Sequence, residues 1–149
     1  MAQGDFKLFE EFAKNLGTGD VHDFGADTFK LGICTTLITP AVDDTTPRWV
    51  NYSGNEVATG NGYTANGETL TATTYAEVSG VAKFDAADVS LTQNTSGFTN
   101  AGWAVLYNDT AANDEAIGFV DMGGPVSLQA GNISFAWNAS GIFTVTVTT

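Results

Sequence analysis

The spacing of apolar residues changes once along this chain, after Gly17, and this change sets the narrowest limit on the fold. Between residues 6 and 16 apolar side chains recur every three or four positions, which is the period of an α-helix. After residue 27 they recur every second position, as in a strand whose two faces meet different surroundings. The sequence therefore predicts a short helix within residues 1–17, followed by a β domain.

The predicted helix is amphipathic and about three turns long. Asp5 is placed to cap its start, and Gly17 to close it in a left-handed conformation. A helix of this length is marginal in isolation, so its apolar stripe is expected to pack on the sheet or on a neighbouring subunit. The aromatic members of the stripe, which we take as candidate partner-binding residues, are Phe6, Phe9 and Phe12.

Short alternating runs fill most of the remaining sequence and are separated by turn residues such as Gly80, Gly97, and Gly123 and Gly124 with Pro125. Runs at hairpin spacing favour antiparallel pairing over a parallel α/β sheet. We therefore expect a mainly β protein, an antiparallel β-sandwich with the jelly roll as one form of it. The runs are 28–38, 69–78, 81–84, 89–92, 103–108, 117–122, 126–128, 133–137 and 142–147.

Composition limits the size of the fold and the classes of partner. A chain of 149 residues with 43% apolar residues can bury one core, so we expect a single domain over residues 1–149. The net charge of −12 repels a nucleic-acid backbone. No run approaches the roughly 20 apolar residues of a membrane span, and no secretion signal is recognised. We expect neither nucleic acid nor membrane as a partner.

Residues 39–68 interrupt the strand pattern with prolines and scattered glycines. A connection of this length in a compact domain usually carries a function or an interface. Its aromatic side chains are either an accessory core or exposed anchors for a partner, and both alternatives stay open. These further candidate partner-binding residues are Trp49, Tyr52 and Tyr63.

Residues suited to catalysis or to metal binding are few. His22 is the one histidine, and Cys34, the one cysteine, is expected to be a small buried side chain within a strand. We predict no catalytic, cofactor-binding or metal-binding residue. Calcium at residues 108–115 is a weaker alternative to a polar hairpin loop, because the loop lacks the EF-hand spacing. A carboxylate hydrolase stays a minor alternative, with the pairs Asp43 and Asp44, Asp85 and Asp88, and Asp114 and Glu115.

Four segments carry a resemblance to known proteins: DTFKL at 27–31, GNGYT at 60–64, WAVLYNDTAAND at 103–114 and IGFVD at 117–121. In these segments the chain resembles a group of small virion proteins of tailed bacteriophages, and the likeness extends over most of its length. The resemblance implies a structural role and no catalytic residue. The most specific stretch is 107–114.

The resemblance implies a capsid decoration or cement protein that binds the major capsid protein and forms a homotrimer or another homo-oligomer. Such a protein would be made in the bacterial cytoplasm and would end on the virion surface. The helix and residues 39–63 would be its docking elements. The alternative is a tail or fibre component that binds a host-surface carbohydrate through Trp49, Tyr52 and Tyr63.

Overall fold

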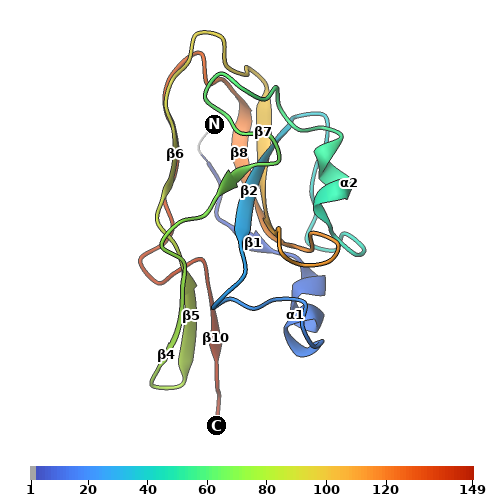
Figure 1. Ribbon diagram of the computed structural model, residues 1–149, viewed down its shortest axis with the longest axis vertical. Coiled ribbons are helices and arrows are strands. Elements are labelled where there is room, and N and C mark those ends of the chain that lie inside the picture. The colour runs from blue at the N-terminus through green and yellow to red at the C-terminus, as the bar shows by residue number, and fades with distance from the viewer. Residues whose placement is uncertain (1–2) are drawn as a thin grey trace.

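The computed structural model describes residues 3–149 and is mainly β, with antiparallel pairing throughout and two short helices (Figure 1). The prediction of an antiparallel β fold with a helix near the start is confirmed. In chain order the elements are β1 (Lys7–Leu8), α1 (Glu10–Gly17), β2 (Phe29–Thr35), α2 (Trp49–Ser53), β3 (Glu68–Thr69), β4 (Thr74–Val78), β5 (Val81–Asp85), β6 (Val89–Leu91), β7 (Ala101–Asn108), β8 (Ala116–Val126), β9 (Ile133–Phe135) and β10 (Phe143–Thr146).

The largest sheet has five strands in the order β1-β8-β7-β2-β3. Strand β7 is central, with Leu106 opposite Leu31 of β2 and Gly118 of β8. Most residues of β7 are buried, because both faces of the sheet are covered. This explains why its sequence is a nearly continuous apolar run.

One face of this sheet packs on two smaller sheets, in the orders β10-β5-β4 and β6-β9, which makes the arrangement sandwich-like. Phenylalanines dominate the core between the layers. Phe24 stacks on Phe29 at a centroid distance of 5.2 Å and lies 4.8 Å from Phe84 and 5.0 Å from Phe143. The core therefore joins the strands to the loop that follows α1.

The opposite face of the five-stranded sheet has a smaller core under α2 and the start of α1. Here the rings of Trp49 and Tyr107 are parallel, with an interplanar angle of 2° and centroids 5.0 Å apart. Phe9 completes the cluster between Tyr52 and Phe119. Cys34 is fully buried in this core, as predicted, and its thiol contacts the Tyr52 carbonyl.

The helix is shorter than predicted. Lys7 and Leu8 form an edge strand that pairs with β8, so the helix begins at Glu10 instead of Phe6. The residue before it is Phe9, so Asp5 does not cap it. The prediction of a left-handed Gly17 is also wrong, because the helix continues through Gly17 and the chain becomes extended at Thr18.

Three further boundaries differ from the prediction. The turn predicted at Gly123, Gly124 and Pro125 lies inside β8, where both glycines have positive φ and the pairing shifts between Asp121 and Val126. The predicted strand 69–78 is divided into β3 and β4 by a bend at Ala72, which has a positive φ. Residues 39–68 contain α2. No helix in residues 3–149 is both long and apolar enough to cross a membrane.

Candidate functional site

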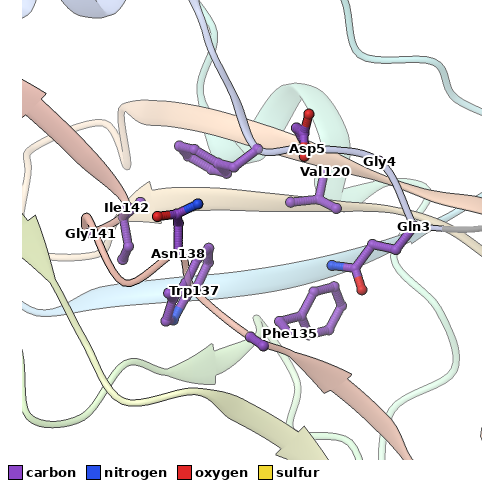
Figure 2. Close-up of a pocket in the computed structure, with 11 residues that line it drawn as sticks. Gln3, Gly4, Asp5, Val120, Phe135, Trp137, Asn138, Gly141 and Ile142 are labelled. Carbon is purple, nitrogen blue, oxygen red and sulfur yellow. The ribbon is translucent and has the colours of Figure 1, made fainter.

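A cleft of about 380 Å³ opens where the extended segment 3–6 passes the segment that follows β9. Its floor is apolar and comes from Val120 of β8, Phe135 of β9 and Ile142 (Figure 2). Its aromatic wall is formed by Phe6 and Trp137, whose rings meet edge to face at 5.9 Å and 89°. The cleft is thus built from segments that lie far apart in the sequence.

Trp137 is held in place by groups outside the cleft. Its indole Nε1–H donates to the Ala87 carbonyl at 3.2 Å, and its backbone N–H donates to Asp88 Oδ1 at 2.9 Å. With the indole N–H already bonded, the half-buried ring offers a ligand its apolar surface. The position of the ring is therefore set before any ligand arrives.

Exposed polar side chains surround the apolar part of the cleft: Gln3, Asp5 and Asn138. Asn138 Oδ1 accepts the Ser140 backbone N–H at 2.8 Å, which orients the amide and leaves its NH₂ group available. Among the described lining residues Asp5 is the one carboxylate, and histidine, cysteine and lysine do not occur. This set of groups can hold an uncharged ligand rich in hydroxyls, but it does not supply two carboxylates for hydrolysis.

A second candidate surface lies on the three-stranded sheet β10-β5-β4, which joins the main core through Phe84 and Phe143 and extends beyond it. We call residues 74–85 and 141–149 the arm; it projects from the body of the molecule in Figure 1. Every residue of β4 is exposed, and so is every residue from Thr144 to Thr149. Its exposed large apolar side chains are Tyr75, Val78, Val145 and Val147.

The aromatic residues predicted in the long segment belong to the core. Trp49, Tyr52 and Tyr63 are each at most 4% exposed. The Tyr52 hydroxyl donates to Asp44 Oδ2, and the Tyr63 hydroxyl donates to Glu56 Oε1, both at 2.8 Å. Of the two alternatives, the accessory core is the one found, and exposed partner anchors at these positions are a wrong prediction.

The predicted helix stripe is also mostly internal. Phe9 and Phe12 are at most 3% exposed and belong to the two cores, whereas Phe6 is half-buried at the cleft. Leu16, at the end of the stripe, is 42% exposed. Of the alternatives given above, the stripe packs on the protein's own sheets, and only Phe6 remains accessible among the three phenylalanines.

His22 packs beside the rings of Phe12 and Phe24, with centroids 5.7 and 5.4 Å away. Its Nδ1 is 3.1 Å from Asn108 Nδ2, and its buried Nε2 has no hydrogen-bond partner within residues 3–149. Burial lowers the pKa of His22, and the nearby carboxylates Glu115 and Asp27 oppose the shift only in part. His22 is thus a packed histidine of the fold.

In each of the three proposed carboxylate pairs, at least one side chain has a structural partner. Asp44 accepts the Ala41 N–H as well as the Tyr52 hydroxyl, and Asp85 forms an ion pair with Lys83 at 3.2 Å. Asp88 holds Trp137, and Glu115 accepts from the Asn113 amide at 2.8 Å. These bonds give each of the three pairs a local role in turns and loops.

Residues 109–115 form the loop between β7 and β8, and Asn108 is the last residue of β7. The Asn108 side chain is fully buried, and its Oδ1 accepts the backbone N–H groups of Thr110 and Ala111. Within residues 3–149, no three His, Cys, Asp or Glu side chains are grouped so that they could hold a metal ion. These hydrogen bonds show that the side-chain amide of Asn108 holds the start of the loop in place.

Sequence reasoning missed the cleft, because its lining comes from four separate segments. Trp137 was the one available signal, as an aromatic residue at the end of a predicted strand and next to Asn138. Comparison with known proteins identifies no relative: no protein-family model, curated protein or solved structure matches the chain.

Proposed function

We propose that this chain is a non-enzymatic structural protein of a tailed bacteriophage virion. Its most specific form is a capsid decoration protein that binds the major capsid protein and stabilises the head. It would be made in the bacterial cytoplasm and would act on the capsid surface as a homotrimer or another homo-oligomer. The sequence resemblance supports the class, and the exposed arm supports a role in assembly.

The arm is the observation that carries the proposal. It contains two acidic residues and one lysine, so its net charge is −1, whereas that of the whole chain is −12. Val78 and Val147 are each 72% exposed on it. An exposed apolar surface of low charge on an otherwise acidic protein is typical of a protein interface.

A capsid lattice makes such a small surface effective. Identical binding sites recur around its symmetry axes, so one oligomer engages several sites together. Once the first contact has formed, each remaining contact forms at a high effective concentration. A weak contact per copy can thus hold neighbouring capsomers together.

The experiment is to locate and count the chain in the purified virion. An antibody against the chain, followed by immunogold microscopy and quantitative mass spectrometry, is expected to label the head, with copies in proportion to capsomers. Label on the tail, or absence from the particle, would refute the decoration role. As a functional control, particles that lack the chain should lose their genome at a lower temperature than complete particles.

A second candidate function is binding of a host-surface carbohydrate by a tail or fibre protein. The cleft favours it, because the Phe6 and Trp137 rings lie beside the amides of Gln3 and Asn138. Aromatic rings pack on the apolar faces of sugars, and amides exchange hydrogen bonds with hydroxyl groups. This moves the proposed platform away from Trp49, Tyr52 and Tyr63.

Binding of host surface polysaccharide, measured by calorimetry, tests the second candidate. The Trp137→Ala variant should lose binding, whereas Tyr75→Ala, which removes an exposed aromatic ring of the arm, should keep it. Equal binding by both variants would exclude the cleft as the sugar site. Tail location together with cleft-dependent binding would favour this candidate over decoration.

A further inference from the structure

Strand β10 forms one edge of the three-stranded sheet and lacks the features that usually protect an edge from pairing. Proteins blunt such edges with charges, proline or bulges. The sequence from residue 142 to residue 149 is IFTVTVTT, which contains neither a charged residue nor a proline. Its alternating valines and threonines have high β propensity. The edge is therefore a ready template for another strand.

The pairing with β5 shows which backbone groups of β10 are free. The Val147 N–H donates to the Gly80 carbonyl at 2.9 Å, and Val145 lies opposite Ala82 in the same register. In an antiparallel ladder alternate residues bond to a given neighbour. Val145 and Val147 therefore bond to β5, and Thr144 and Thr146 direct their N–H and C=O groups to the open edge.

This edge is self-complementary about Val145. Suppose that the β10 strands of two chains lie antiparallel, with Val145 of one chain opposite Val145 of the other. Thr144 of each chain then lies opposite Thr146 of the other chain. Both threonines present outward backbone groups, so each pair can exchange two hydrogen bonds. On the face of the sheet opposite to the threonine side chains, Phe143 of one chain lies opposite Val147 of the other chain, which is a favourable apolar pair.

Charge favours a second copy as the occupant. Two chains of net charge −12 repel each other over most of their surfaces. Strand β10 is uncharged, and the two charged residues of the neighbouring strand β5, Lys83 and Asp85, form an ion pair at 3.2 Å. Glu77 lies on β4, at the opposite edge of the sheet. Contact through β10 thus joins the two chains along a strand that adds no like-charge repulsion of its own.

We propose that two copies of this chain associate through β10 around a two-fold axis at Val145, forming a continuous six-stranded sheet β4-β5-β10-β10-β5-β4. The interface is isologous, so each copy supplies the same strand. This contact does not depend on a capsid. The dimer can therefore be disproved while the virion role is confirmed, or be confirmed while the virion role is disproved.

Cysteine cross-linking tests the register in the whole chain. In a non-hydrogen-bonded antiparallel pair the Cα atoms are about 4.5 Å apart, which is within reach of a disulfide. The Val145→Cys variant should form a covalent dimer under mild oxidation. Val147→Cys is the matched control, because in this register its two copies lie four pairs apart. The native Cys34 is fully buried and should remain unreacted in both variants.

Charged substitutions at Thr144 and Thr146 give an independent test, with dimerisation measured by sedimentation equilibrium. Thr144→Asp combined with Thr146→Asp places like charges opposite each other and should weaken dimerisation roughly tenfold. Thr144→Lys combined with Thr146→Asp places opposite charges there and should restore it. A wild-type chain that stays monomeric at its highest soluble concentration would refute the proposal. Equal cross-linking at positions 145 and 147, or a trimer unaffected by the paired aspartates, would also refute it.

Discussion

Trp49 lies directly over Gly32, and a β carbon at position 32 would overlap the six-membered part of its indole ring. The helix α2 carries the indole onto the sheet from one side, and Gly32 on β2 leaves room for it. The second core therefore depends on a residue that has no side chain.

The Gly32→Ala substitution should destabilise the protein by about 1–3 kcal/mol, because the indole must move away from its place beside Tyr107. Urea unfolding followed by circular dichroism measures this loss. Gly54→Ala is the control: position 54 has helical φ and ψ, and its β carbon would meet no atom within 4 Å. Equal effects of the two substitutions would contradict the packing described for Trp49.

Phe12 should be essential for stability. Its ring packs edge to face on Phe143 at 4.9 Å and on Phe24 at 6.0 Å, so Phe12→Ala should cost about 3–5 kcal/mol. Leu16→Ala, on the same helix but 42% exposed, should change stability by less than about 0.5 kcal/mol. Thermal unfolding of the two variants distinguishes a core helix from one that only docks a partner, for which Phe12→Ala would be mild.

Asn108→Ala should be among the most destabilising polar substitutions. Its amide reaches the Val21 carbonyl, His22 Nδ1 and Asp27 Oδ2, and its oxygen closes the following loop. Removing it leaves several half-buried groups without their partner, at a cost on the order of 3 kcal/mol. Asn113→Ala removes an exposed amide of the same loop and is the control in chemical denaturation. A loss below that of Asn113→Ala would show that water replaces the amide.

Stability should fall as the pH drops below about 6.5. The pKa of His22 is lowered in the folded state, chiefly by burial, so below the unfolded-state pKa the unfolded chain binds more protons. The stability that His22 contributes in its neutral form is fully present above the unfolded-state pKa. It is lost as the pH falls through the folded-state pKa. In His22→Gln, urea midpoints between pH 7 and pH 5 should depend less on pH. An unchanged slope would mean that another group titrates there.

The strand pattern predicted most strands, although burial does not alternate along β2 and β7, because both faces of the sheet are covered there. It succeeded for β2, β5 and β7, whose boundaries lie within about three residues of the prediction. It failed at β1, where Phe6 and Phe9 fit a helical stripe although Lys7 and Leu8 extend the sheet. A two-residue edge strand leaves too short a pattern to compete with a helix next to it.

Glycine misled the prediction at β8. Gly123 and Gly124 read as a turn, yet their positive φ values bend one continuous strand as a bulge. Residues that suit a turn also suit a bulge, and only the partner strand distinguishes the two. The positions of Trp49, Tyr52 and Tyr63 were ambiguous in a similar way. Because these residues lie outside a strand pattern, the sequence did not indicate which face of the sheet their rings cover.

The strand pairings also determine when the protein can fold during its synthesis. Lys7 pairs with Phe119, and Phe29 with Asn108, so the large sheet joins residues about a hundred positions apart. Contacts this distant slow folding, and a ribosome adds roughly 5–20 residues each second. For several seconds the nascent chain therefore carries β2 without β7, and its apolar strands must stay apart from those of neighbouring nascent chains until the last third of the sequence emerges.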